Sequence, residues 1–282
     1  MLVSLREILR IASAKSCAIG SFNTPNLASI KAVISAAEEL KQPVIIMHAQ
    51  LHEEMGLCKM EEIAPIMLFM ADRAAVPVCV HLDHGTDLDY IKKGLDIGFT
   101  SVMYDGSELE EELNYANTCI AVEAAARYGA SVEAEIGSMG ARESGTDSGN
   151  NESVYTEPKA AKRFAAETGI DALACAFGTA HGLYLKKPKL DFGRLKEIHS
   201  LVSVPLVMHG GSGVSHEDYK KAIAFGIRKI NYYTYMAKAG GSAVSKLADK
   251  TFFHDIETAA IKGMKEDVKS AITVFSGMYA GH

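Results

Sequence analysis

Residues 77–85 read Pro77-Val78-Cys79-Val80-His81-Leu82-Asp83-His84-Gly85. A short apolar run that follows a proline and stops at polar residues and a glycine predicts a buried β-strand over Pro77–Leu82. A histidine followed by a glycine recurs after two later apolar runs, at His181 and at His209. Because a His-Gly pair follows each of three predicted strands, we expect the residues that carry out the chemistry to lie together at one end of the sheet.

Seven other short apolar runs are spread along the chain, with helical stretches between them. The eight predicted strands are Cys17–Phe22, Pro43–His48, Pro77–Leu82, Thr100–Tyr104, Ser131–Ile136, Ala172–Ala176, Pro205–Met208 and Lys229–Asn231. Strands that alternate with helices form a parallel sheet, and eight repeats in 282 residues predict an α/β fold, the closed (β/α)8 or TIM barrel. An open, doubly wound sheet is the rival, but no Gly-x-Gly-x-x-Gly follows the first strand.

Apolar residues at helical spacing predict the helices between these strands. The helical patterns cover 27–40, 60–74, 108–128, 158–168, 192–202 and 215–225, with a further stripe near the N-terminus and a helical segment at the C-terminus. No linker or shift in composition divides the chain, so we expect one domain over residues 1–282. The polar, glycine-rich stretch at about 138–156 predicts a mobile loop that closes over the barrel.

The composition excludes several classes of protein. With 48% hydrophobic residues the chain can bury a large core, and its net charge of −6 argues against a nucleic-acid partner. No apolar run approaches the length of a membrane span, and the N-terminal stretch does not read as a signal peptide. Five cysteines without a Cys-x-x-Cys pair predict reduced, mostly buried thiols in a cytoplasmic protein.

The three histidines are candidate metal ligands. Neutral imidazole is a common zinc ligand, and three protein ligands leave the fourth position open, as in catalytic zinc sites. A single histidine at a strand end more often only satisfies local hydrogen bonds. His84, His181 and His209 all follow the same end of their strands, which favours a shared metal, and Asp83 lies beside them as a candidate acid or base.

Acidic residues also lie at or near the ends of predicted strands. Asp105 follows the fourth predicted strand, and Glu133 and Glu135 alternate along the fifth, so both point to one face of the sheet. Because a carboxylate inside a barrel must be paired or bound to a metal, we expect a buried ion pair for Glu133 and place Glu135 in the site. The sequence leaves the facing of Lys229 open, and no lysine stands out as a Schiff-base nucleophile. Carbanion chemistry would therefore need a metal.

The last two predicted strands lead into polar segments that suit a phosphate. Gly210-Gly211-Ser212-Gly213 precedes a predicted helix and can turn backbone N–H groups toward an anion. Asn231-Tyr232-Tyr233-Thr234 ends the eighth strand. Barrel enzymes frequently hold a phosphate in the loops after strands seven and eight, so these segments predict a phosphate site.

Taken in order, the motifs resemble the class II, zinc-dependent fructose- and tagatose-bisphosphate aldolases over nearly the whole chain. The matching stretches are 20–23 (GSFN), 81–85 (HLDHG), 101–107 (SVMYDGS), 131–137 (SVEAEIG), 155–158 (YTEP), 178–184 (GTAHGLY) and 209–213 (HGGSG). The stretch 178–184 looks most like the tagatose-bisphosphate branch.

The resemblance implies specific roles for the residues found above. It implies one Zn²⁺ on His84, His181 and His209, an alternative metal position at Asp105 and Glu135, and a monovalent cation, Na⁺ or K⁺. Asp83 would move the proton of the C4 hydroxyl, and Glu143 the C3 proton of dihydroxyacetone phosphate. The phosphate of that substrate would lie on Gly182, Gly210, Ser212, Asn231 and Thr234. The implied partner is a sugar phosphate, and the implied assembly is a homodimer or homotetramer.

Some positions depart from the family pattern, and they concern the acceptor aldehyde. Met47-His48-Ala49 stands where fructose-bisphosphate members commonly have Gln and Ser, and His254 stands near the position of an Arg that grips the second phosphate. The sequence therefore predicts a metal-dependent aldolase that splits a ketose 1-phosphate, with bisphosphates as poor substrates. A non-catalytic descendant that binds a sugar phosphate and a zinc-dependent barrel hydrolase are the alternatives, and the roles of His254 and Tyr233 stay open.

Overall fold

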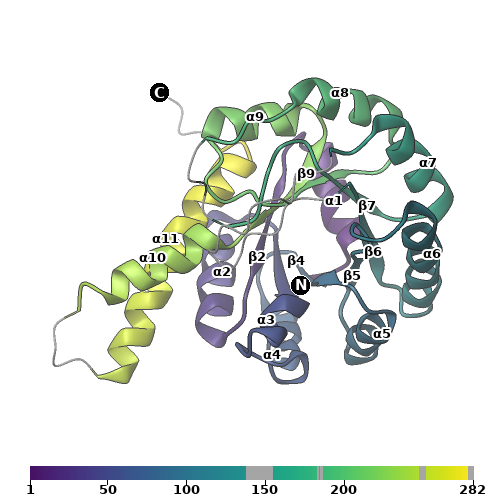
Figure 1. The fold of residues 1–282 in the computed structure, drawn as a ribbon. Coiled ribbons are helices and arrows are strands. Elements are labelled where there is room, and N and C mark those ends of the chain that lie inside the picture. The colour runs from purple at the N-terminus through teal and green to yellow at the C-terminus, as the bar shows by residue number, and fades with distance from the viewer. Residues whose placement is uncertain (138–154, 183, 185–186, 248–251, 279–282) are drawn as a thin grey trace.

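Eight parallel strands close into a barrel in the computed structural model, which describes residues 1–137, 155–182, 184, 187–247 and 252–278. The barrel strands are β2 (Ile19–Asn23), β3 (Val44–Ala49), β4 (Val78–Gly85), β5 (Ser101–Tyr104), β6 (Ser131–Ile136), β7 (Ala172–Cys175), β8 (Leu206–Met208) and β9 (Ile227–Tyr232). Pairing of β2 with both β3 and β9, and of β4 with β5, completes the ring. The predicted (β/α)8 barrel is confirmed, and each predicted strand overlaps an observed one (Figure 1).

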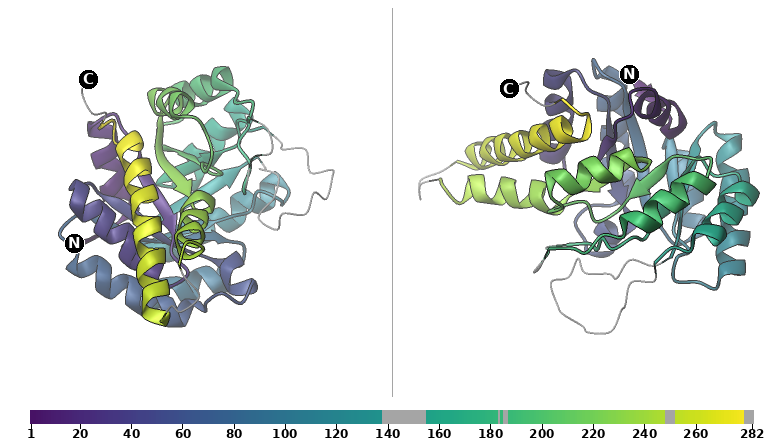
Figure 2. Two further views of the ribbon diagram at one scale, coloured as in Figure 1. Left: turned by 90° about the vertical axis from the view of Figure 1, so that its left-hand side faces the viewer. Right: turned by 90° about the horizontal axis from the view of Figure 1, so that it is seen from above.

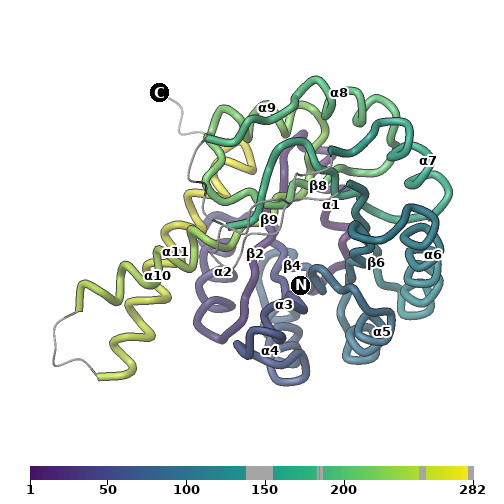
Figure 3. The backbone as a smooth tube through the Cα atoms, viewed as in Figure 1, coloured from purple at the N-terminus to yellow at the C-terminus, as the bar shows by residue number. Residues whose placement is uncertain are grey.

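Helices surround the barrel and connect its strands (Figure 3). They are α1 (Leu5–Ala14), α2 (Leu27–Leu40), α3 (Gln50–Glu54), α4 (Met60–Arg73), α5 (Leu88–Ile97), α6 (Glu111–Arg127), α7 (Pro158–Thr168), α8 (Phe192–Leu201), α9 (His216–Ala224), α10 (Thr234–Val244) and α11 (Phe253–Phe275). The six patterns predicted between strands correspond to α2, α4 and α6 to α9, whereas those patterns do not single out α3, α5 or α10.

Helix α1 plugs the N-terminal end of the barrel. Its buried face presents Leu5, Ile8 and Leu9 to inward-pointing residues of the strands, among them Ile45 and Val207. Each of these fully buried leucine and isoleucine side chains stabilises the fold by about 1.5–3 kcal/mol. Apolar packing closes this end, and the polar residues at the strand ends line a cavity at the opposite end.

Helices α10 and α11 lie side by side and project away from the barrel (Figures 1 and 2). Helix α11 also packs on α2, and at its C-terminal end the carbonyl of Phe275 accepts a hydrogen bond from the N–H of Ala18 at 2.9 Å. The end of the last helix is thereby fixed beside the first barrel strand. None of the described helices combines the length and apolarity needed to cross a bilayer.

Most of the loop predicted at 138–156 lies outside the described residues, and Glu143 lies there with it. The cysteines agree with their prediction, since all five are free thiols and Cys17, Cys79 and Cys175 are buried.

Candidate active site

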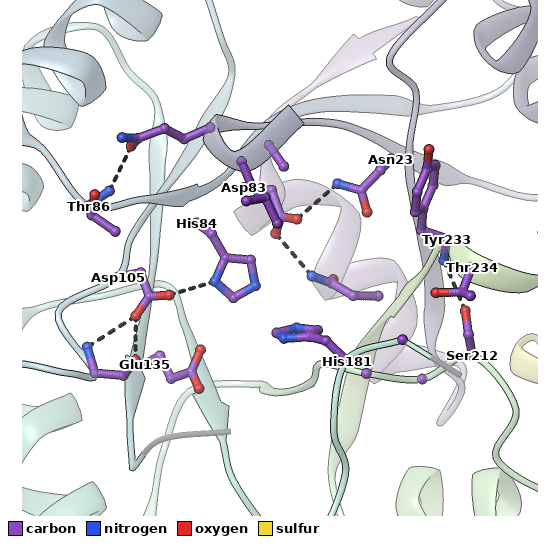
Figure 4. A pocket seen from close by; sticks show the side chains of 18 of the residues that line it. Asn23, Asp83, His84, Thr86, Asp105, Glu135, His181, Ser212, Tyr233 and Thr234 are labelled. Atoms are coloured by element: carbon purple, nitrogen blue, oxygen red, sulfur yellow. Dashed lines mark hydrogen bonds and ion pairs between the residues drawn. The ribbon is translucent and has the colours of Figure 1, made fainter. Parts of the chain in front are cut away.

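A cavity of about 540 Å³ opens at the C-terminal ends of the strands (Figure 4). Its walls are loops and strand ends that lie far apart in the sequence, from Asn23 on β2 to Thr234 at the start of α10. The predicted site residues that line it are Asp83, His84, Asp105, Glu135, His181, Gly182, Gly210, Ser212, Asn231 and Thr234. His209 is buried directly beneath them, against the ring of His84.

The rings of the three histidines converge. The centroid of His84 lies 5.1 Å from that of His181 and 4.6 Å from that of His209, and the other two rings are 6.0 Å apart. One ring nitrogen from each residue lies within 4.8 Å of the other two. This spacing suits three ligands of one ion.

A distortion of β4 aims the first of these rings. His84 has a left-handed backbone with φ of 47°, and the pairing of β4 with β5 shifts register between Leu82 and Gly85. Such an irregularity redirects a side chain from the sheet. Nδ1 of His84 then donates to Asp105 at 2.6 Å, while its buried Nε2 has no hydrogen-bond partner.

The two ring nitrogens of His209 also have different surroundings, as those of His84 do. Its Nε2 donates to Glu133 at 2.9 Å, whereas its buried Nδ1 makes no aligned hydrogen bond and lies 3.2 Å from Oε2 of Glu135. A histidine that donates one ring N–H to a carboxylate and keeps the other nitrogen free is the usual state of a metal ligand. Nε2 of His84 and Nδ1 of His209, neither of which makes an aligned hydrogen bond, therefore fit a bound metal ion with Glu135 close by.

The electrostatics of the pocket favour a cation. Burial alone would lower the pKa of His84, but the nearby carboxylates of Asp83 and Asp105 raise it to about 10. His84, Asp105 and Glu135 also form a second group whose ligand atoms lie within 4.8 Å of one another. A divalent ion would take the place of the proton that these carboxylates attract.

Asp83 is held by two amides, one from the first barrel strand and one from the last. Nδ2 of Asn23 donates to one carboxylate oxygen at 3.0 Å (Figure 4). Nδ2 of Asn231 donates to the other oxygen, also at 3.0 Å. Burial would raise the pKa of Asp83, yet His84 and Lys229 lower it below its usual value. Asp83 is thus an oriented carboxylate. The sequence patterns assign Asn23 no role, although its place at the end of the first strand is a usable signal.

Glu133 forms the expected buried ion pair. Its carboxylate lies 2.9 Å from Nζ of Lys229 and also accepts from His209. Lys229 points into the barrel, where its Nζ further donates to Oδ1 of Asn231 at 2.7 Å. Because Lys229 is fully buried beneath the cavity and does not line it, nothing in this geometry makes it a nucleophile toward substrate.

The loops after β7, β8 and β9 form one side of the cavity. Gly210 has φ of 60°, and a Cβ there would lie 2.4 Å from the carbonyl oxygen of Ala180, so only glycine allows this approach. Oγ of Ser212 accepts from the N–H of Tyr233, next to the first turn of α10 at Thr234. These groups surround the positive end of a helix dipole, which suits a phosphate.

The opposite side of the cavity is built by α3 and the loops after β4 and β5. It presents Gln50, Leu51, Glu54, Thr86, Glu108 and Leu109, and no lysine or arginine is among the described lining residues. His254 is not part of this wall either. It lies exposed on α11 and stacks on Phe252.

The family model for class II fructose-bisphosphate aldolases matches residues 3–278. The chain belongs to this family.

Relatives of this aldolase support the assignment over most of its length. It is 40% identical over 245 residues to a probable fructose-bisphosphate aldolase of Bacillus subtilis (strain 168), covering 86% of this chain and 85% of the relative. It is 39% identical over 238 residues to the sulfofructosephosphate aldolase of Alkalicoccus urumqiensis, covering 84% and 82%. The crystal structure of the YdjI aldolase from Escherichia coli K12 superposes with a TM-score of 0.87, at 37% identity and 98% and 97% coverage.

At the end of β3 this aldolase carries a buried polar network. Nε2 of His48 lies 2.9 Å from the hydroxyl of Tyr90, which donates to Glu53 at 2.9 Å. Burial lowers the pKa of His48 to about 4, although Glu53 opposes the shift. His48 does not line the cavity and is linked through Tyr90 to α3, whereas Ala49, from the same departing stretch, does line it.

Proposed function

We propose that the protein is a metal-dependent aldolase that reversibly cleaves a ketose 1-phosphate into dihydroxyacetone phosphate and an aldehyde. The observation that carries the proposal is the convergence of one ring nitrogen from each of His84, His181 and His209, all within 4.8 Å of one another. They lie close to the oriented carboxylate of Asp83. Family membership and aldolase relatives support the reaction class.

His84, His181 and His209 would hold the ion, with Asp105 and Glu135 as an alternative position beside it. When bound, Zn²⁺ supplies Lewis acidity at the oxygens of the donor. A monovalent cation near Gly182, Gly210 and Ser212 belongs to the same proposal.

Asp83 accepts the proton of the C4 hydroxyl as the C3–C4 bond breaks and the electron pair of that bond passes to C3. Its two amide donors keep the carboxylate in place for that transfer. Glu143, which lies outside the described residues, then delivers a proton to C3, and dihydroxyacetone phosphate results. Gly182, Gly210, Ser212, Asn231 and Thr234 bind the phosphate.

Metal analysis and turnover test the proposal together. The purified protein is analysed for divalent metal and assayed with a panel of ketose 1-phosphates for release of dihydroxyacetone phosphate, before and after treatment with a chelator and after Zn²⁺ is restored. We expect about one ion per chain and activity that is lost and regained with it. His84→Ala should lose both, whereas Glu123→Ala, on an exposed face of α6, should retain both.

Each alternative has its own outcome. Full turnover without metal would refute metal dependence. Binding of the sugar phosphates without release of dihydroxyacetone phosphate from any of them would identify a non-catalytic descendant. Metal-dependent release of inorganic phosphate in place of dihydroxyacetone phosphate would identify a hydrolase.

A further inference from the structure

Lys229, itself fully buried, lies at the centre of a network that reaches the cavity at Asp83 and Asn231 and links the two halves of the site. Its Nζ contacts Glu133, which accepts from His209, and it also contacts Asn231, which donates to Asp83. Glu133 is on β6 and Lys229 on β9, two strands that are not neighbours in the sheet, so the ion pair crosses the barrel interior.

We infer that Lys229 is a positioning residue that fixes the amide of Asn231 and, through it, the carboxylate of Asp83. The inference rests on the proposed function, in which Asp83 moves the C4 proton. A lysine ammonium group can only donate hydrogen bonds, and an ionised carboxylate can only accept them. Asn231 can satisfy both neighbours in one orientation alone, with Oδ1 toward Lys229 and Nδ2 toward Asp83.

Without the ammonium group the oxygen of Asn231 loses its donor, and the amide is held only by its hydrogen bond to Asp83. An amide fixed at one end is free to shift, and the hydrogen bond that orients the second oxygen of Asp83 shifts with it. Asp83 then keeps a firm hydrogen bond only from Asn23. A misplacement of about 1 Å in a reacting group can cost on the order of 10²-fold in rate.

The two half-reactions of the proposed mechanism separate this role from general damage. Cleavage of a ketose 1-phosphate needs Asp83, whereas exchange of the C3 proton of dihydroxyacetone phosphate with solvent does not. Lys229→Met should therefore reduce kcat for cleavage by about 10-fold or more. KM should rise as well, because Asn231 also belongs to the proposed phosphate site. Metal content and the rate of C3 exchange at saturating dihydroxyacetone phosphate should stay within about threefold of wild type.

Cleavage is measured with the best ketose 1-phosphate of the panel above, and exchange by NMR of dihydroxyacetone phosphate in D₂O. Lys229→Met leaves the Glu133 carboxylate without its cation, so Lys229→Met/Glu133→Gln serves as a second variant with neither charge. The amide of the second substitution still offers His209 an oxygen as acceptor. The matched control is Ser101→Ala, because Ser101 is a buried residue that bonds His81 at 2.8 Å and does not contact Asn231.

The expected result is a selective loss of cleavage in both Lys229 variants, with Ser101→Ala close to wild type. Equal losses of cleavage and exchange, or no loss of either, would overturn the inference while the proposed function stood. Absence of both reactions in the wild-type protein would overturn the proposed function and the inference with it.

Discussion

Replacing His48 by glutamine should make the protein less sensitive to acid. His48 is fully buried at the end of β3, and burial lowers its pKa from 6.5 to about 4. The unfolded chain exposes this ring, so between pH 6.5 and 4 the unfolded state binds a proton that the folded state does not. The stability linked to His48 is thus complete above pH 6.5 and is lost as the pH falls toward 4.

The size of the effect follows from the shift. One pKa unit corresponds to about 1.4 kcal/mol, so lowering the pH from 7 to 5 should remove about 2 kcal/mol of the unfolding free energy through this residue alone. Glutamine has no such proton and can still hydrogen-bond Tyr90. At pH 7 the unfolding free energy of His48→Gln will differ from that of wild type because of local repacking. Between pH 7 and 5, however, it should fall less than that of wild type.

Urea unfolding of both proteins at the two pH values, at one fixed Zn²⁺ concentration, measures this difference. Exposed His254→Gln is the matched control and should follow wild type. If wild type and His48→Gln lost the same free energy between pH 7 and 5, the assigned origin of the acid sensitivity would be wrong.

Three further predictions concern chemistry. Asp83→Ala should retain the metal and lose turnover by ~10²-fold or more, the scale of general acid–base catalysis, which steady-state kinetics and metal analysis check together. Fructose and tagatose 1,6-bisphosphate should be poor substrates, because the acceptor side of the cavity presents Glu54 and Glu108 and no described cation; a kcat/KM of ~10⁴ M⁻¹s⁻¹ or more for either would contradict this. Burial raises the pKa of Cys79 and of Cys175 to about 12, so both thiols should resist a thiol reagent until the protein is unfolded, and rapid labelling of either in the native protein would show that the interior opens.

The sequence predicted the barrel well because the residues that mark where a strand begins lie directly next to that strand. Pro43, Pro77 and Pro205 each stand directly before an observed strand, where a missing N–H costs no ladder hydrogen bond. The ends were harder to predict. Strand β4 runs on to Gly85 instead of stopping at Leu82, because a register shift against β5 lets His84 leave the regular pleat without ending the strand.

Pairs that meet across the barrel could not be predicted from local pattern. The period of two placed Glu133 and Glu135 on one face and favoured an ion pair for Glu133, yet it could not name Lys229 as the partner. Likewise the link from His48 through Tyr90 to Glu53 joins three elements whose approach depends on packing. Such contacts follow from the closed ring, and the ring is a property of the whole chain.

Closure of that ring has a consequence for synthesis on the ribosome. At the seam of the barrel Ser21 pairs with Asn231, which lies 231 − 21 = 210 positions later in the chain. The second edge of β2 therefore stays unpaired until β9 has been synthesised. A nascent chain that ends before β9 has two open strand edges and only one of the two amides that hold Asp83. Competence for turnover should therefore appear late and abruptly during translation, when the last strand docks, and shortened chains should depend on chaperones until then.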